Sequence, residues 1–403
     1  MRTLTEHRAA TLALGLPLPV VEVGLELADG LVLAEDVRSD ELLPRWDNSA
    51  MDGYAVRAAD VAEVPVTLTV VAELPAGSAD EPVVGVGTAA RIMTGAPVPA
   101  GADAIVPVED TDGGTVTVTV RSGAIAGAHI RRAGGDAVPG DLVVVGGTAL
   151  GPAHIAAVAS VGHPTVRVHR RPRVAVLSTG DELVTPGTPL RRGQLPDSNS
   201  WLQASAVREA GAEALRLGPV SDDPHALHAL LLALDDGSAH GPFDAIITSG
   251  GVSVGAYDVV KAALADEPGV AFVRVAVQPG KPQGLGRLPN GTPIFTLPGN
   301  PVSAFASFEM FVRPALRRMA GHADVERPMA DAIADDAWTT PPDRAQLMPV
   351  RWVSPDRVRR ASAGGSGSHL VARLALAEGL AVIPAEIDSV AVGDRIRVLR
   401  MGR

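Results

Sequence analysis

Residues 292–319 read TPIFTLPGNPVSAFASFEMFVRPALRRM, and this stretch indicates the fold class. The apolar run at 294–297 is typical of a buried strand, and a long helical pattern begins directly after the turn Pro298-Gly299-Asn300-Pro301. Pro301 suits the first position of a helix, and Asn300 suits the capping position before it. The turn is therefore expected to direct several backbone N–H groups toward one point at the positive end of a helix dipole. Such a point favours an anion.

Strands and helices alternate around this stretch, from about residue 173 onward. The strand-like runs are 174–177, 215–217, 245–248, 272–277 and 294–297, and the helical runs are 200–210, 224–234, 259–265 and 301–319. This rhythm predicts a doubly wound, mostly parallel α/β sheet with helices on both faces. Ligands of such sheets bind beyond the carboxyl ends of the strands.

The rest of the chain has a different sequence pattern, and the two patterns together predict a multidomain α/β plus β protein. Helical patterns at 3–16, 23–34 and 152–160 flank a region of short Val/Thr runs separated by Gly, Pro and Asp turns. The predicted units are an N-terminal mixed α/β domain at 1–41 and 141–169, an inserted β domain at 42–140, the α/β domain at 170–322 and a C-terminal β domain at 323–403.

Composition excludes several classes of function. The chain has 403 residues, a formal net charge of -11 and 20% charged residues, which argues against nucleic acid as a general partner. It has no cysteine, so disulfides, thiolate zinc sites and cysteine nucleophiles are absent. The sequence contains no run of about 18 uninterrupted apolar residues, so it predicts no membrane span. We expect a cytoplasmic protein.

Two further Gly-rich turns follow predicted strands, at 178–182 and 249–255. In a parallel sheet they open on the same edge as the turn at 298–301. Glycine lets backbone amides approach phosphate oxygens closely, so the three turns together predict a site for a phosphorylated ligand. The candidate contacts are Ser178, Thr179, Gly180, Ser249, Gly250, Gly251, Ser253, Pro298, Gly299, Asn300 and Pro301.

Carboxylates lie beside these turns, notably Glu182, Asp222 and Asp258. A phosphate site crowded with acids is consistent with a divalent cation that bridges them, and Mg²⁺ is the usual choice for oxygen ligands. Capping of the helix that follows is the alternative reading for the segment Asp222-Asp223-Pro224. Lys281, one of only two lysines, lies in a stiff Pro-Gly-Lys-Pro turn and suits an anion.

The inserted β domain carries a polar cluster of its own, in the segments 46–55, 91–97 and 131–136. Arg131 and Arg132 are candidates to hold an oxyanion there, with Asp52 and Asp136 nearby. Ordinary turn residues of a β domain are the alternative reading.

Six motifs in one order resemble a known family. They are SAMDGYAVR (49–57), RIMTGAPVPAGAD (91–103), STGDEL (178–183), SGGVSVG (249–255), PGKP (279–282) and LPGNPVSA (297–304). The chain resembles the bacterial molybdopterin molybdenumtransferase family (MoeA), which is related to the C-terminal part of gephyrin. The resemblance covers nearly the whole chain.

This resemblance implies a four-part elongated protomer in a homodimer, with a molybdopterin-binding α/β domain and a C-terminal β-barrel. It implies molybdenum insertion into adenylylated molybdopterin with molybdate, Mg²⁺ and release of AMP. The active site would lie between the α/β domain of one protomer and the inserted domain of the other. Molybdate is expected near Arg131 and Thr94.

The family's motif positions transfer onto residues of this chain. The catalytic positions implied are Asp52, Asp136, Glu182, Asp222, Asp258 and Lys281. Binding positions implied beyond the three turns are Thr94, Arg131, Arg274 and Ser368. Two departures from the family pattern concern charge: Gln278 stands where relatives often have lysine, and Gly135 stands where they often have glutamate.

Other functions remain open at this point. The α/β domain also resembles the adenylyltransferase of the preceding step, and a carrier or scaffold would bind molybdopterin without turnover. Tungstate has nearly the same size and charge as molybdate. A molybdopterin adenylyltransferase and maturation proteins of molybdoenzymes are candidate partners.

Overall fold

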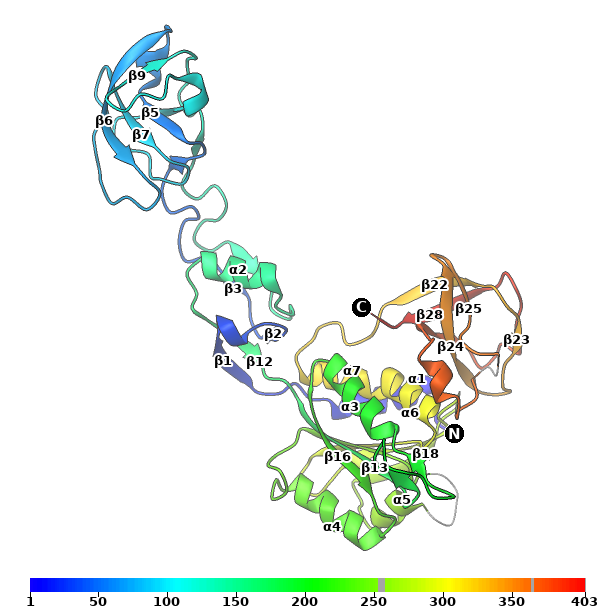
Figure 1. The fold of residues 1–403 in the computed structure, drawn as a ribbon. Helices are drawn as coiled ribbons and strands as arrows, with labels where there is room; N and C mark the ends of the chain where they lie inside the picture. Colours follow the sequence, from blue (N-terminus) through cyan, green and yellow to red (C-terminus); the bar gives the residue numbers. More distant parts are fainter. Residues whose placement is uncertain (253–257, 364–365, 403) are drawn as a thin grey trace.

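The computed structural model describes residues 1–252, 258–363 and 366–402. The molecule is elongated (Figure 1): a β domain lies at one end, a small mixed domain follows it, and an α/β domain and a β-barrel lie together at the other end. In the described part of the chain, no helix is long and apolar enough to cross a membrane.

The α/β domain is built on a six-stranded sheet with the order β16-β13-β17-β21-β20-β18. The first four strands are parallel to one another, β20 runs antiparallel to them, and β18, which is antiparallel to β20, again runs in their direction. The strand bounds are β13 Arg173–Thr179, β16 Glu213–Val220, β17 Ala245–Ser249, β18 Val270–Arg274, β20 Pro282–Arg287 and β21 Pro293–Leu297. The predicted doubly wound, mostly parallel sheet is thus confirmed.

Helices cover both faces of this sheet (Figure 1). On one face, Val176, Ile247 and Phe295 pack with residues of α3 and of the 301–319 helix, whereas the alternate residues Ala175 and Ile246 pack with α4 and α5 on the other face. The bounds are α3 Asn199–Glu209, α4 Pro224–Asp235 and α5 Val259–Ala263. α1 (Leu4–Leu14) packs against the end of the 301–319 helix.

The 301–319 helix contains a π-helical segment. It runs as α6 (Pro301–Ser307), the π-helical η4 (Phe308–Val312) and α7 (Arg313–Met319). Glu309 in this segment is buried and accepts hydrogen bonds from Arg327, which lies in the link to the C-terminal domain. The π-helical segment thereby carries one partner of a buried ion pair.

The predicted strand at 272–277 is only partly correct. β18 ends at Arg274, and β19 (Val277–Gln278) leaves the sheet to pair with β24 of the barrel. The sequence prediction missed β20 because its PQGLGR sequence is poor in β-forming residues. Glycine is needed there, since a Cβ on Gly284 would lie 2.1 Å from Thr296 Oγ1 on the neighbouring strand.

The predicted helix at 23–34 is wrong. The chain there forms β1 (Val20–Gly24), a short 3-10 turn η1 (Leu25–Leu27) and β2 (Val32–Leu33). Both strands pair with β12 (Thr165–His169), and the sheet order is β1-β12-β2. The β-branched valines of β1 favour this sheet. α2 (Pro152–Ser160) has the predicted bounds.

The inserted domain holds a five-stranded sheet with the order β8-β5-β7-β6-β9. Its strands are β5 Gly53–Val56, β6 Val66–Leu74, β7 Thr88–Ile92, β8 Ala104–Pro107 and β9 Thr117–Val120. Shorter elements complete this domain and its connections: β3 Val37–Arg38, β4 Asn48–Ser49, η2 Ala58–Val61, η3 Val108–Asp110, β10 Ile130–Arg131 and β11 Leu142–Val144.

The C-terminal domain is a closed barrel. Its strands pair in the ring β24-β25-β22-β28-β26, and β26 pairs with β24 to close it. The bounds are β22 Met329–Ala334, β24 Ala345–Ser354, β25 Arg357–Arg360, β26 Gly379–Ile383 and β28 Arg395–Arg400. The remaining short elements are β14 Leu183–Val184, β15 Leu195–Pro196, β23 Trp338–Thr339, α8 Val371–Leu374 and β27 Ser389–Val390.

Candidate active site

The three predicted turns meet at one edge of the sheet. β13, β17 and β21 are parallel neighbours, so the segments after Thr179, Ser249 and Leu297 leave the sheet side by side. They line a cavity of about 980 Å³, which we call the sheet-edge cavity. The predicted residues in its lining are Thr179, Gly180, Glu182, Asp222, Ser249, Gly250, Gly251, Asp258, Pro298, Gly299, Asn300 and Pro301.

The backbone of the turns explains one of these glycines. Gly250 has a φ of 100°, and a Cβ there would lie 2.7 Å from the carbonyl oxygen of Thr179. Its N–H donates to the carbonyl of Leu297 at 3.1 Å, so one turn is held by both neighbouring strands. Only glycine combines this conformation with so close an approach. Ser253, predicted in the same turn, lies outside the described residues.

Asp181 and Asp222 lock two turns together. The N–H of Asp222 donates to Asp181 Oδ1 at 3.0 Å, and the N–H of Asp181 donates to Asp222 Oδ2 at 3.3 Å. Capping of α4 falls to Asp223, whose Oδ1 accepts from His225 and Ala226. The capping expected as the alternative for this segment is therefore made by Asp223, whereas Asp222 lines the cavity.

The acidic residues do not form a preassembled metal site. Glu182, Asp222 and Asp258 all line the sheet-edge cavity, but no group of three His, Asp or Glu side chains in the described residues is arranged to hold an ion. Their oxygens match the ligands that Mg²⁺ prefers, and Mg²⁺ commonly takes one or two carboxylates and completes its shell with water and substrate phosphate. The donor set fits such a shared site.

One wall of the cavity was missed by sequence reasoning. Asp197, Ser198 and Asn199 lie at the start of α3, and the Nδ2 of Asn199 donates to the carbonyl of Gly299 at 2.6 Å. This bond braces the 298–301 turn from the opposite side. The segment 196–199 directly precedes the predicted helix at 200–210. That position at a helix start is the signal that could have predicted this wall of the cavity. Ser178 is fully buried in β13 and does not belong to the lining.

The barrel occupies part of the helix N-terminus that the sequence predicts for an anion. The N–H of Val302 donates to the carbonyl of Ser368 at 3.1 Å, and Asn300 Nδ2 donates to Ser368 Oγ at 3.0 Å. The segment around Ser368 thus ties the barrel to the start of α6. His369, next to it, lines the sheet-edge cavity.

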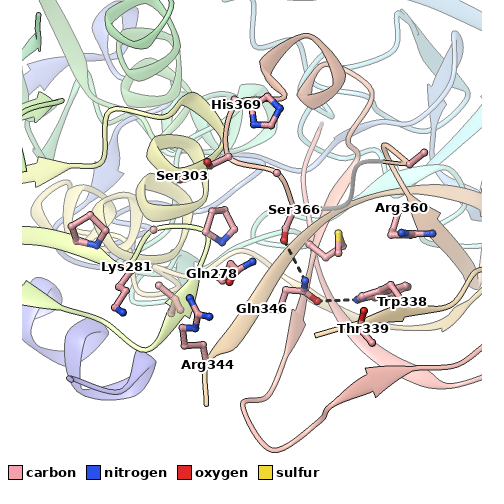
Figure 2. Close-up of a pocket in the computed structure, with 18 of the residues that line it drawn as sticks. Gln278, Lys281, Ser303, Trp338, Thr339, Arg344, Gln346, Arg360, Ser366 and His369 are labelled. Atoms are coloured by element: carbon pink, nitrogen blue, oxygen red, sulfur yellow. Dashed lines mark hydrogen bonds between the residues drawn. The ribbon is translucent and has the colours of Figure 1, made fainter. Parts of the chain in front are cut away.

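A second cavity of about 910 Å³ adjoins the first, between the 277–282 segment and the barrel (Figure 2). We call it the basic cavity. Lys281 and Arg344 line it, and neither forms an ion pair with a residue that the structure describes. Its described lining contains no carboxylate, and Arg360, which also lines it, is paired with Asp336 at 2.8 Å. The cavity therefore has an uncompensated positive charge.

The two cavities share three lining residues, Pro282, Ser303 and His369. The buried Gln283 holds the turn that contains Lys281. Its Nε2 donates to the carbonyl of Gly280 at 2.7 Å and to Ser307 Oγ at 2.6 Å. A ligand in one cavity therefore lies next to a ligand in the other.

Several other predicted residues lie outside the sheet-edge cavity. Ser368 lines the basic cavity, whereas Arg274 is exposed in β18 and lines neither cavity. Asp136 lines a separate cavity of about 400 Å³ where the inserted domain joins the N-terminal domain. Arg131 is exposed in β10, opposite Asn48 of β4.

Asp52 and Thr94 form a unit in the inserted domain. Asp52 Oδ1 accepts from both the N–H and the hydroxyl of Thr94, each at 2.7 Å. These two hydrogen bonds, the backbone one first, hold the pKa of Asp52 below its ordinary value. Within one chain this pair is far from the sheet-edge cavity, since the inserted domain lies at the opposite end of the molecule (Figure 1).

Family comparisons cover almost the whole chain. Residues 2–162 match the MoeA N-terminal region (domain I and II), residues 175–318 match a probable molybdopterin binding domain, and residues 331–401 match the MoeA C-terminal region (domain IV). These boundaries follow the parts seen in the fold.

Individual relatives agree. Molybdopterin molybdenumtransferase 2 of Mycobacterium tuberculosis (strain ATCC 25618 / H37Rv) is 45% identical over 411 residues, which cover 99% of each chain. The molybdopterin molybdenumtransferase of Haemophilus influenzae is 34% identical over 405 residues, which cover 99% of this chain and 98% of that protein.

Solved structures give the same result. The molybdopterin biosynthesis MoeA protein from Pyrococcus horikosii matches with a TM-score of 0.84 and 31% identity, over 100% of this chain and 99% of that chain. A second MoeA structure, from Pyrococcus horikoshii OT3, matches with a TM-score of 0.79 and 26% identity over the full length of both. The chain therefore belongs to the MoeA family of molybdopterin molybdenumtransferases and is a transferase.

Proposed function

We propose that the chain is a cytoplasmic enzyme that inserts molybdenum into adenylylated molybdopterin, using molybdate and Mg²⁺ and releasing AMP. The observation that carries this proposal is the pair of adjoining cavities. One is lined by Gly-rich turns suited to phosphates, and the other by unpaired cations suited to an oxyanion. The names of the relatives supply the substrate class.

The sheet-edge cavity would hold the phosphorylated pterin. Ser249, Gly250 and Gly251 offer a turn at the end of β17, where backbone amides can approach phosphate oxygens. Asn199 braces the facing turn. Because these groups are held by hydrogen bonds before a ligand arrives, little reorganisation is needed when charge develops on the leaving phosphate.

The basic cavity would hold molybdate. Lys281 and Arg344 offer positive charge to a tetrahedral dianion, and the shared wall would place that dianion beside the dithiolene of the bound pterin. This location differs from the sequence-based expectation near Arg131 and Thr94. Those residues lie in the inserted domain, far from both cavities of the same chain (Figure 1).

Mg²⁺ would be held by Glu182, Asp222 and Asp258 together with phosphate oxygens of the substrate. When bound, it would offset phosphate charge and stabilise the charge that builds up on the departing AMP. The Asp181–Asp222 hydrogen bonds orient one of these carboxylates toward the cavity. Lys281 acts on the oxyanion side and does not compete with the cation.

A homodimer would complete the site. Asp52 and Thr94 form a rigid acceptor–donor pair that is remote from the cavities of its own chain. A second copy, docked with its inserted domain over the sheet edge, would bring that pair to the substrate. Asp136 and Arg131 of the partner would lie on the same domain.

The test is AMP release from adenylylated molybdopterin with Mg²⁺, with and without molybdate. We expect release that requires molybdate and yields active cofactor. Replacement of Glu182 or Asp222 by alanine should abolish turnover and leave the melting temperature close to that of the wild type. Full activity in either variant would refute the assignment.

Two other functions give different results in the same assay. An adenylyltransferase would consume ATP and would not need molybdate, whereas a carrier would bind molybdopterin tightly and release no AMP. Tungstate in place of molybdate separates the two oxyanion substrates, and a molybdopterin adenylyltransferase added to the assay tests direct transfer between partners.

A further inference from the structure

Three buried side chains of the barrel form a hydrogen-bonded chain at the wall of the basic cavity (Figure 2). Trp338 Nε1 donates to Gln346 Oε1 at 2.9 Å, and Gln346 Nε2 donates to Ser366 Oγ at 3.2 Å. Trp338, Gln346 and Ser366 are only 7%, 3% and 8% exposed. All three line the cavity that contains Lys281 and Arg344.

The direction of this chain is fixed by chemistry. An indole N–H can only donate, so it selects the oxygen of the Gln346 amide, and the amide nitrogen must then face Ser366. Ser366 Oγ accepts that bond, which leaves its own hydroxyl hydrogen for a different partner. In the described part of the chain that hydrogen has no acceptor, and Ser366 lies at the cavity surface.

We infer that Ser366 is an oxyanion-binding donor of the basic cavity, and that Trp338 and Gln346 are the positioning residues that turn its hydroxyl toward the substrate. The inference rests on the proposed function, because it assigns the third donor for molybdate beside Lys281 and Arg344. A molybdate dianion accepts hydrogen bonds and offers none, so it needs a wall of oriented donors.

The direction of the Trp338–Gln346–Ser366 hydrogen bonds decides what Ser366 presents to the cavity. A serine that donated to Gln346 would present lone pairs to the anion and would repel it. Because Trp338 holds the amide in one orientation, the hydroxyl does not have to reorganise when the anion binds. Hydrogen bonds in such a chain also polarise one another, which strengthens the last donor.

The test measures molybdate binding to the full-length protein by calorimetry, with sodium molybdate as the probe. Ser366→Ala should raise the Kd for molybdate about tenfold, the effect of one hydrogen bond to a charged group. Trp338→Phe keeps the ring and removes the N–H, and it should raise the Kd about threefold because Gln346 is no longer held in one orientation. Trp352→Phe, a matched substitution elsewhere in the barrel, should leave the Kd unchanged.

The double variant distinguishes positioning from a general structural effect. If Trp338 acts through Ser366, Trp338→Phe has no further effect in the Ser366→Ala background. In turnover, Ser366→Ala should raise the molybdate KM and leave kcat nearly unchanged, since the lost contact belongs to binding. Molybdopterin affinity, measured on the same variants, should stay at the wild-type value and reports an intact fold.

Two results would overturn the inference. If Ser366→Ala binds molybdate as tightly as the wild type, Ser366 is not a donor to molybdate. The proposed function still stands in that case if the wild type releases AMP only with molybdate. If Trp338→Phe lowers molybdate affinity equally in the wild-type and Ser366→Ala proteins, Trp338 does not act through Ser366. A wild-type protein that neither binds nor requires molybdate overturns the proposed function itself.

Discussion

Gln278 faces the basic cavity two positions before the Gly280-Lys281 turn, at a position where the family resemblance implies a lysine. Its backbone pairs with Gln346 of β24, and Gln278 lines the same cavity as Lys281 and Arg344 (Figure 2). Gln278→Lys adds a third cation, beside Lys281 and Arg344, that lacks an ion pair, and the described lining of the cavity has no carboxylate. We expect its molybdate Kd to fall severalfold and to become more dependent on salt. Calorimetry at two salt concentrations measures this, and an unchanged Kd would show that the oxyanion binds elsewhere.

His7 makes stability depend on pH. It is 1% exposed and packs edge-on against Phe311, with ring centroids 4.6 Å apart. Burial, with a smaller effect of the nearby Arg2 charge, lowers the pKa of His7 from 6.5 to about 4. The unfolded chain therefore binds a proton more readily than the folded protein between these pH values. Stability should be fully present above pH 6.5 and should fall as the pH drops toward 4.

His7→Gln tests this dependence. The wild type should lose on the order of 3 kcal/mol through His7 across that window. The variant should lose less, although His322, whose pKa burial also lowers to about 4, still contributes. Urea unfolding at several pH values measures both slopes, and identical slopes would remove His7 from the account.

Sequence reasoning located the three Gly-rich turns of the sheet-edge cavity because each follows a predicted strand, but it missed the wall at residues 197–199. It missed Arg344, Gln346 and Ser366 because they belong to the barrel, and only the tertiary fold brings them to Lys281. Arg274 ends β18 at the same edge of the sheet as the turns, but β20 separates β18 from β21, and the Arg274 side chain lines neither cavity.

At the scale of elements, the π-helical η4 holds the link between the α/β domain and the barrel. The Glu309 side chain is fully buried, and Arg327, 8% exposed, contacts it at 2.5 Å and contacts Glu209 of α3 at the same distance. Arg327→Met leaves Glu309 buried without this partner and should destabilise the protein by about 3–5 kcal/mol.

An exposed ion pair provides the control for this substitution. Arg167 and Glu35 are 2.9 Å apart on the surface, and Arg167→Met should leave the unfolding midpoint nearly unchanged. Equal stability of the two variants in urea would show that the Glu309–Arg327 pair does not fix the link.

Strand and helix patterns were readable where the period was clear, as in α2 and in the four parallel strands. They failed at 23–34, where the apolar spacing suited both a helix and a sheet edge, and pairing with β12 decided the outcome. They failed at β20 because two of its six residues are glycines that the close packing of neighbouring strands requires.

At the scale of the whole molecule, the Asp52–Thr94 pair and the two cavities lie at opposite ends of one chain (Figure 1). If a homodimer shares its sites, Asp52→Ala and Asp222→Ala disable different halves of each site. Mixed subunits should then recover about one quarter of wild-type activity, because half of the dimers are mixed and each has one intact site of two.

Subunit exchange must be verified in this mixing experiment, and native mass spectrometry of differently tagged chains does so. Exchanged dimers that stay as inactive as the parent variants would contradict a site shared between the two chains.

The most direct test of the two-cavity account separates the substrates. AMP release is measured in Lys281→Met and Asp222→Asn while molybdate and adenylylated molybdopterin are varied independently. The account predicts that Lys281→Met raises the molybdate KM at least about tenfold, the loss of a charged contact, with unchanged molybdopterin affinity. Asp222→Asn should lose turnover and keep its molybdate affinity. A wild-type molybdate KM in Lys281→Met would contradict the assignment of the basic cavity to the oxyanion.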